Sequence, residues 1–441
     1  MSAVTFRGGV HPRYNKQRTA ELAVAPLEPP EEIAIPLGQH IGAPASPCVA
    51  KGDRVLIGQR IGEAGGFVSA PVHASVSGEV EAIEPRPGAT GSPIPAVVIA
   101  NDGRDESVEF EGLGDDWENA APEEIRDHTS RAGLVGMGGA AFPTHVKLSP
   151  PKDKPIDTVI INGAECEPYL TADHRTLLER SADVVAGLRI AGRVLGAERG
   201  LVAIERNKPD AIAEMRKVLA GTGFEVVELE VKYPQGAEKQ LIDACLGRRV
   251  PSGALPMEVG VVVQNAGTAA AIADAVIRGR PLYERVVTVT GAPVARPANL
   301  SIRIGTPVSH AIEACGGELE RAGKLVLGGP MMGLAQVGAA APVVKGTSGI
   351  LLLGADEIDA REPDPCIRCG RCVRACPMAL VPTEIASLGV LRRWEDAERA
   401  DALDCIECGS CAYECPSRIP LVQQIRLAKS AIAAARRKQK G

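Results

Sequence analysis

Eight cysteines near the C-terminus stand in two runs with the same spacing. The runs are CIRCGRCVRACP, which begins at Cys366, and CIECGSCAYECP, which begins at Cys405, and each reads C-x2-C-x2-C-x3-C-P. Three thiolates spaced in this way fit a tight loop around one face of a [4Fe–4S] cluster, and the fourth cysteine usually ligates the cluster of the other run. We therefore assign one cluster to Cys366, Cys369, Cys372 and Cys415, and the other to Cys405, Cys408, Cys411 and Cys376.

Zinc is the main alternative for these cysteines, because C-x2-C pairs also make tetrahedral zinc sites. Four ligands complete a zinc site, however, and zinc gives no reason for the C-x3-C-P ending to occur twice. Disulfides rank lower still. The spacing therefore predicts a protein that moves electrons one at a time.

A glycine-rich segment is the second region with recognisable chemistry. It reads GLVGMGGAAFPTHVKL, from Gly133 to Leu148, and DTVIINGAECEP follows from Asp157 to Pro168. Glycines let the backbone approach a ligand closely and present amide N–H groups to a phosphate, which Lys147 can neutralise. The G-x-G-x-x-G spacing of a Rossmann fingerprint is absent. The pattern alone leaves a phosphate-bearing cofactor and a plain turn equally open.

Composition limits the classes of function. The chain has 441 residues, a net charge of −6 and 3% aromatic residues, so it offers neither the charge nor the stacking surfaces of a nucleic-acid binder. The first ten residues lack the apolar segment of a signal peptide, and no apolar run approaches the roughly 20 residues that span a bilayer. Four further cysteines, together with exposed clusters, indicate a reducing compartment. We expect a chain in the cytosol or on the cytosolic face of a membrane assembly.

Short segments rich in glycine and proline fill residues 33 to 100, which predicts a small all-β module. The KGDRVLIGQ and APVHASV segments resemble the paired hairpins of lipoyl and biotinyl domains. The tip between them, Gly62–Phe67, contains no lysine, so we expect a docking role and not a swinging arm.

Apolar strands alternate with helical stretches between residues 123 and 270, which argues for an α/β domain. The expected strands are Thr158–Ile161, Leu201–Ile204, Glu225–Leu229 and Val259–Val263. A smaller α+β unit follows from residue 286 to about 333. The spacer between the cysteine runs contains a helical apolar stripe formed by Ile385, Leu388, Leu391, Trp394 and Leu403.

Several motifs resemble those of the flavin- and NADH-binding subunit of respiratory complex I. GMGGAAFPTHVKL and NGAECEP are similar to its GRGGAGFPTGxKW and NADEGEP, YPQGAE to its YxCGEE, and QNAGT to its NNxxT. The segment GTPVSHAIEACGG is similar to the β-grasp module of that protein. Over nearly its whole length, including the opening FRGGVHPRYNK, the chain resembles RnfC of the Rnf complexes, which transfer electrons between ferredoxin and NAD while translocating sodium ions or protons.

The resemblance implies the site residues. The FMN candidates are Gly136, Gly138, Gly139, Lys147, Asn162, Glu165 and Glu167. Contact with NAD(H) is implied for Tyr233 and Glu238, and the NNxxT position falls on Asn265 and Thr268. Three residues depart from the complex I pattern, namely Met137, Ala164 and Ala237, which weakens the expectation of flavin and nucleotide binding. The plain alternatives are that Asn162 caps a turn and Glu165 pairs with a surface lysine.

The resemblance also implies a multidomain α/β architecture. We expect a β-rich barrel-sandwich-like module over residues 1–105, an α/β FMN- and NADH-binding domain over 106–282, a β-grasp-like module over 283–345, and an α-helical, ferredoxin-like domain with two [4Fe–4S] clusters over 346–441. The basic residues at the end of the last domain fit a solvated helix end, and the alternative is contact with an acidic partner or lipid.

The implied function is that of a peripheral subunit of an ion-translocating ferredoxin:NAD oxidoreductase, passing electrons between NAD(H), FMN and two clusters. Its partners would be the other subunits of a membrane-embedded complex, and it would lie at the cytoplasmic face of the membrane. No catalytic acid or base is proposed, and we expect structural roles for Cys166, His145 and His174. Two alternatives stay open: a flavin and iron–sulfur cobalamin reductase of bacterial microcompartments, and a non-catalytic iron–sulfur wire or docking subunit.

Overall fold

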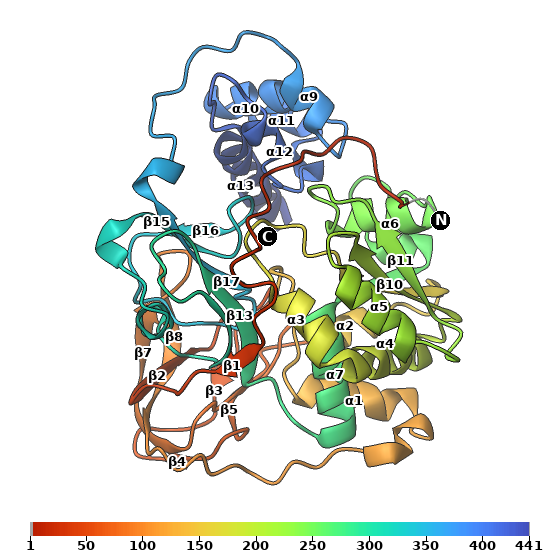
Figure 1. The fold of residues 1–441 in the computed structure, drawn as a ribbon, viewed down its shortest axis with the longest axis vertical. Helices are drawn as coiled ribbons and strands as arrows, with labels where there is room; N and C mark the ends of the chain where they lie inside the picture. The colour runs from red at the N-terminus through yellow and green to blue at the C-terminus, as the bar shows by residue number, and fades with distance from the viewer. Residues whose placement is uncertain (1–2, 441) are drawn as a thin grey trace.

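The structure is a computed structural model that describes residues 3–440, with side chains up to residue 438. Met1, Ser2 and Gly441 of the predicted end domains, and the side chain of Lys440 in the basic run, lie outside the described residues. Figure 1 shows the helices of the cysteine-rich region at one end of the molecule, above a β-rich half and an α/β half that lie side by side.

The N-terminal module consists of two antiparallel sheets around a shared core. One sheet has the order β2-β8-β7-β4 and the other β3-β5-β6. Apolar side chains alternate along the strands, so Ile33 and Ile35 of β2 point inward and are fully buried. The strands are β2 (Glu32–Pro36), β3 (Ser46–Pro47), β4 (Arg54–Val55), β5 (Arg60–Glu63), β6 (Val72–His73), β7 (Gly78–Pro87) and β8 (Pro93–Asn101).

The loop between β5 and β6, where a lipoyl domain would carry its lysine, packs against the glycine-rich segment. The Phe67 ring meets the His145 ring edge-on at 5.8 Å, and the Phe67 carbonyl lies 2.9 Å from Nε2 of His145. The loop therefore contacts the α/β domain of its own chain, and the docking role of the module stays a prediction.

A four-stranded parallel sheet with the order β11-β10-β9-β12 forms the α/β domain. Its strands are β9 (Thr158–Gly163), β10 (Arg199–Glu205), β11 (Glu225–Leu229) and β12 (Val261–Asn265). The last strand begins later than predicted, because Pro256–Val259 forms the 3-10 turn η2, which ends at Gly260 with φ 72°. The surrounding helices are η1 (Gly114–Glu118), α1 (Pro122–Arg131), α2 (Thr144–Lys147), α3 (Ala172–Glu179), α4 (Ser181–Leu195), α5 (Pro209–Val218), α6 (Glu238–Leu246) and α7 (Ala266–Arg278).

The chain changes direction within this sheet. From β9 it proceeds through β10 to β11 on one side, and it then returns to place β12 on the other side of β9. The point between the carboxyl ends of β9 and β12 is therefore the topological switch point, where open parallel sheets leave a crevice for ligands.

The third module contains a six-stranded sheet with the order β1-β14-β13-β17-β15-β16. Strand β17 (Gly349–Gly354) pairs with β13 and β15, so the sheet extends past the predicted boundary at residue 345. Strand β1 (Val24–Pro26) joins from the N-terminal region. The other elements are β13 (Glu284–Thr290), β14 (Ala298–Arg303), α8 (Val308–Ala314), η3 (Leu319–Arg321), β15 (Ala322–Leu327), β16 (Leu334–Gln336) and η4 (Ala355–Glu357).

The cysteine-rich domain is helical and follows an exposed linker over residues 359–365 (Figure 1). The apolar stripe predicted between the cysteine runs is correct for Ile385, which is fully buried. It is wrong for Leu391, which is 66% exposed. The helix α10 ends there in a turn, with Arg392 at φ 57°. The elements are α9 (Arg371–Ala375), α10 (Pro382–Val390), α11 (Trp394–Arg399), η5 (Ala402–Asp404), α12 (Ser410–Tyr413) and α13 (Leu421–Lys440).

Candidate functional site: a cofactor crevice beside two cysteine loops

The two cysteine loops have the same backbone conformation. Arg368 and Glu407 occupy equivalent positions with left-handed φ values of 55° and 57°, and each is followed two residues later by a left-handed glycine. The amides of Arg368 and Glu407 donate to the sulfurs of Cys366 and Cys405, both at 3.4 Å. N–H···S bonds of this kind help to set cluster potentials.

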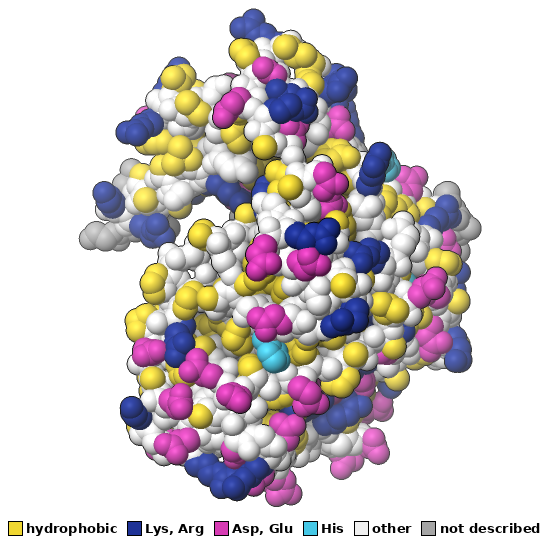
Figure 2. All heavy atoms as spheres, turned by 60° about the vertical axis from the view of Figure 1, so that its left-hand side comes forward, with side chains coloured by type: hydrophobic (Ala, Val, Ile, Leu, Met, Phe, Trp, Pro, Cys, Tyr) yellow, Lys and Arg dark blue, Asp and Glu magenta, His cyan; other side chains and the backbone are white. Residues whose placement is uncertain are grey.

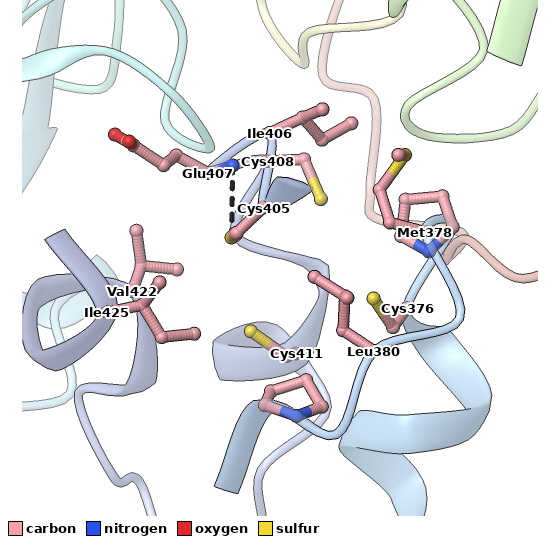
Figure 3. A pocket seen from close by; sticks show the side chains of 13 residues that line it. Cys376, Met378, Leu380, Cys405, Ile406, Glu407, Cys408, Cys411, Val422 and Ile425 are labelled. Atoms are coloured by element: carbon pink, nitrogen blue, oxygen red, sulfur yellow. Dashed lines mark hydrogen bonds between the residues drawn. The ribbon is translucent and has the colours of Figure 1, made fainter. Parts of the chain in front are cut away.

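Four thiols from both runs line a single pocket, which Figure 3 shows from close by. The space in it that atoms do not fill is about 360 Å³. The remaining lining is largely apolar and includes Leu380, Val422 and Ile425. Burial and the three neighbouring thiols raise the pKa of the Cys411 thiol to about 12. The thiols that meet here, called the inner set below, are Cys376, Cys405, Cys408 and Cys411.

The inner set combines three cysteines of the second run with the last cysteine of the first, which is the crossed arrangement predicted from the spacing. Among the described side chains, residues 3–438, no three or more His, Cys, Asp or Glu lie close enough together to hold a single metal ion. Four sulfur donors around a pocket with apolar walls are the donor set that a [4Fe–4S] cluster requires, so the residues present fit that group.

The other four cysteines, Cys366, Cys369, Cys372 and Cys415, form the outer set. Cys366 and Cys369 are exposed, whereas Cys372 is buried. Burial raises the pKa of the Cys372 thiol, and the nearby Cys415 thiol adds to this effect. Cys415 therefore lies near Cys372 of the first run, and Cys366 and Cys369 are the exposed members of the outer set.

The glycine-rich segment folds into a tight turn that leaves open space. The amide of Gly136 donates to the Phe142 carbonyl at 2.8 Å, and the amide of Met137 donates to the Thr268 hydroxyl at 2.9 Å. A Cβ on Gly139, which has φ 106°, would meet nothing within 4 Å, and one on Gly138 would meet only the Asn265 side chain. The turn thus presents bare backbone beside Asn265, as a cradle for a phosphate requires.

The carboxyl ends of β9 and β12 bring two predicted residues side by side. Asn162 and Asn265 are direct partners in the parallel register, at the switch point of the sheet. Asn265 also caps α7: its Oδ1 accepts from the Thr268 amide at 3.2 Å, and its Nδ2 donates to Asp173 at 2.6 Å. Asn162 donates to the Gly236 carbonyl at 2.8 Å and accepts from the Ala164 amide, so it has the turn-capping role raised as an alternative.

Lys147 reaches the same edge of the sheet from α2. Its ammonium donates to the Val263 carbonyl at 2.9 Å and to Glu238 at 2.7 Å, and both charged side chains are about one-third exposed. A partly exposed cation at this edge of the sheet is suited to an anionic ligand.

The two predicted glutamates make structural contacts. Glu165, at φ 45°, accepts from the amides of Asp173 and His174 at the start of α3, so it caps that helix and does not pair with a surface lysine. Glu167 accepts from the amides of Met331 and Met332, and burial raises its pKa to about 7. Their approach to FMN stays a prediction.

Tyr233 links the α/β domain to the inner set. It is only 1% exposed, and its hydroxyl donates to the Cys408 carbonyl at 2.7 Å. Helix α6 makes a second link: its Glu238 pairs with Lys147, and its Gln240 donates to Met378 beside the thiol pocket at 3.1 Å. The predicted nucleotide contact of Tyr233 stays untested, but its hydroxyl is engaged with the cysteine loop.

Residues 3–16, which we call the strap, contribute contacts that the sequence did not reveal. Val4 hydrogen-bonds along the edge of β11, and Val10 exchanges two backbone hydrogen bonds with Tyr233. The amide of Gly9 donates to the Ala375 carbonyl at 2.8 Å. Lys16 is buried, and its ammonium donates to the carbonyls of Glu165 and Glu167 at 2.8 and 2.9 Å. The only available signal was the pair of glycines at positions 8 and 9.

Three residues expected to be structural have structural contacts. His174 Nε2 lies 2.8 Å from Asp210, and His145 contacts the β5–β6 loop as described above. The buried Cys166 sulfur accepts from the Gly236 amide at 3.2 Å, and burial raises the pKa of this thiol. A crevice opens between α3, α7 and β13, and the space in it that atoms do not fill is about 1400 Å³. It adjoins the glycine turn through Met137 and the switch point through Asp173 and Gly267, although none of the predicted site residues themselves line it.

Family models cover most of the chain. They match the RnfC barrel sandwich hybrid domain at residues 4–104, the Nuo51 FMN-binding domain at 129–274, the SLBB domain at 286–335 and the 4Fe-4S dicluster domain at 358–416. Among residues 3–440, no helix has both the length and the apolar character needed to cross a membrane.

Full-length relatives are similar to the chain. It is 50% identical to the C subunit of the Na(+)-translocating ferredoxin:NAD(+) oxidoreductase complex of Acetobacterium woodii, over 98% of both chains. It is also 50% identical to the C subunit of the proton-translocating ferredoxin:NAD(+) oxidoreductase complex of Clostridium ljungdahlii, over 99% of this chain and 96% of the relative. A chain of NAD+-reducing [NiFe]-hydrogenase has a similar fold, with a TM-score of 0.50 at 20% identity, over 75% of this chain and 69% of its own.

Proposed function

This chain belongs to the RnfC family of the ion-translocating Rnf oxidoreductase complexes, and we propose that it passes electrons between NAD(H), FMN and two [4Fe–4S] clusters as a peripheral subunit of such a complex. We further propose that it lies at the cytoplasmic face of the membrane. In the same proposal, the third module is β-grasp-like and the cysteine-rich domain ferredoxin-like.

One observation carries the proposal: the loops at the switch point and the inner set of thiols are joined by direct contacts. Tyr233 hydrogen-bonds to Cys408, and α6 contacts Lys147 at one position and the inner pocket two residues later. Bound FMN would exchange a hydride with NAD(H) and single electrons with the clusters. The geometry therefore favours the inner set as the ligands of the cluster next to the flavin, and the outer set as those of the second.

The residues of the chain have separate tasks in this proposal. Gly138 and Gly139 give the FMN phosphate access to backbone amides, and Lys147 supplies a positive charge. Asn162 and Asn265 fix the loops at the ends of β9 and β12. Tyr233 and the strap hold the cysteine loop against this edge. No proton transfer by a side chain is required.

The first experiment is an anaerobic NADH titration of protein reconstituted with iron, sulfide and FMN, followed by absorbance and EPR spectroscopy. Loss of flavin absorbance together with a reduced-cluster signal is the expected result. Clusters that dithionite reduces and NADH does not would contradict the nucleotide site and leave the non-catalytic wire. The Lys147→Ala variant should bind FMN more weakly and keep both clusters, whereas Lys154→Ala, whose ammonium pairs with Glu258 on the surface, is the matched control.

A further inference from the structure

The two cysteine loops differ in the side chains between their cysteines. The positions of Arg368, Arg371 and Arg374 in the first run correspond to Glu407, Ser410 and Tyr413 in the second. All three arginines are exposed. The first run therefore surrounds its cysteines with cations, and the second does not.

Nothing in the described part of the chain neutralises two of these arginines. Arg368 and Arg371 have no ion-pair partner among the described residues, and Arg374 contacts only the carbonyl of Cys369, at 3.4 Å. Two carboxylates of the preceding linker are paired with other arginines, Asp364 with Arg418 and Asp359 with Arg361. In the second run, by contrast, Glu407 pairs with Arg426 and Lys429 of α13. The positive charge of the first loop thus faces outward without a partner.

The same loop also presents apolar surface and two of the outer thiols. Ile367 is 69% exposed and Val373 38%, and Cys366 and Cys369 are exposed beside them. Figure 2 shows hydrophobic, Lys and Arg side chains, with some Asp and Glu, over the lobe at the top of the molecule. Protein interfaces combine an apolar centre with arginines in this way, and charge of one sign steers a partner of the opposite sign.

We propose that this face, made of Arg368, Arg371, Arg374, Ile367 and Val373, is the surface through which the chain docks onto an acidic patch of the next electron-transfer subunit of its complex. The proposal rests on the proposed function, because it takes the outer set as the ligands of the cluster at which electrons leave or enter. It commits to a protein partner, since the exposed apolar side chains are interleaved with the arginines in one compact loop. An anionic lipid surface is the other occupant that the test below distinguishes.

The test uses inverted membrane vesicles that contain the complex without this subunit, and measures rebinding of the purified, cluster-loaded full chain. The variant R368Q/R371Q/R374Q is expected to bind at least about tenfold more weakly, with a smaller dependence on salt, because the steering charge is gone. The matched control R436Q/R437Q/K438Q removes three exposed cations from the end of α13 and is expected to bind as the wild type does.

Each other outcome overturns the proposal. Unchanged binding of R368Q/R371Q/R374Q would overturn it. Weaker binding of the R436Q/R437Q/K438Q control alone would also overturn it and would assign docking to the basic end of α13. Equal binding of the wild type to phosphatidylglycerol vesicles would assign the face to lipid. A shifted potential of the outer cluster with intact rebinding would show that the arginines serve the cluster alone.

Two further measurements keep the result interpretable. The variant R368K/R371K/R374K retains the charge and should rebind within about twofold of the wild type. If the triple glutamine variant lacks iron, the single variant R371Q replaces it, and its binding to the vesicles is expected to be about threefold weaker than that of the wild type. NADH should reduce the clusters of the isolated glutamine variant as in the wild type. Failure of NADH to reduce the wild type would refute the proposed function, whereas the rebinding measurement would still test the docking face.

Discussion

The two cysteine loops share one backbone and differ in nearly everything around it. In both loops the residue two positions after the first cysteine has a left-handed backbone, and its amide donates to the sulfur of that cysteine at 3.4 Å. Tyr233 holds the second run at Cys408, and α6 and the strap hold the end of the first run at Met378 and Ala375. Arg368 and Arg371, earlier in the first run, face solvent. Cysteine spacing thus determines what a loop binds, and the side chains between the cysteines determine what the loop contacts.

The largest expected effect separates the two sets of ligands. Replacing Cys408 with alanine should remove the inner cluster and abolish the EPR signal that NADH induces, because the cluster beside the flavin crevice is lost. Replacing Cys369 should remove the outer cluster and leave that signal. Iron analysis checks that each variant has lost about half of its iron. If instead the Cys369 variant lost the NADH-induced signal and the Cys408 variant kept it, the outer cluster would be the one next to the flavin.

A smaller effect is expected from the strap. A Cβ at Gly8, which has φ 86°, would lie 2.8 Å from the carbonyl oxygen of Cys376. Gly8→Ala should therefore reduce the opening free energy of the segment around Cys376, at the end of the first run, by about 3 kcal/mol, as measured by anaerobic hydrogen exchange. Gly221→Ala is the control, because Gly221 has φ 81° and no neighbour within 4 Å, so only the backbone penalty of about 1 kcal/mol applies. Equal losses would show that the strap contact does not stabilise the segment around Cys376.

The hydroxyl of Tyr233 should contribute about 1 kcal/mol, the usual net value of one hydrogen bond. Tyr233→Phe leaves the buried carbonyl of Cys408 without this donor, and hydrogen exchange in the second cysteine loop should report the loss. The matched variant is Tyr413→Phe in the second run, where the side chain is 51% exposed and no change is expected. Similar hydrogen exchange in both variants would show that the Tyr233 hydroxyl does not stabilise the second cysteine loop.

The smallest effect compares equivalent positions of the two loops. Glu407→Gln weakens the ion pairs with Arg426 and Lys429 and should lower the free energy of unfolding, measured by thermal denaturation, by about 0.5 kcal/mol. The loss is small because these side chains are partly exposed. Arg368→Gln removes no ion pair among the described residues and should leave stability unchanged. A larger loss for Arg368→Gln would reveal a structural role that conflicts with a free docking face.

Local patterns in the sequence were sufficient for part of this site. The spacing predicted that Cys376 joins Cys405, Cys408 and Cys411, and these four thiols line one pocket; their role as cluster ligands stays a prediction. The strand Glu225–Leu229 was also predicted correctly from its run of residues. The RnfC, Nuo51, SLBB and dicluster domains follow one another in the order that the motifs indicated.

Contacts between distant segments were not predictable in this way. Gly9 and Ala375 are separated by most of the chain, and no local pattern relates them. The same holds for Tyr233, whose hydroxyl partner is a carbonyl in another domain, and for β17, which pairs with strands on the other side of the predicted boundary. Glu165 fitted a cofactor motif, while the helix that it caps begins seven residues later.

The strap has a consequence for how the protein is made. Its residues leave the ribosome well before their partners, because the α/β edge that Val4 and Val10 join is complete only after Tyr233 has been synthesised. The partner of Gly9, Ala375, emerges later still. Domains usually fold in order from the N-terminus during synthesis, but here the strap must wait for the cysteine-rich domain. We therefore expect the cysteine-rich domain to dock as the closing event of assembly, when a nascent chain could still be met by the machinery that inserts iron and sulfide.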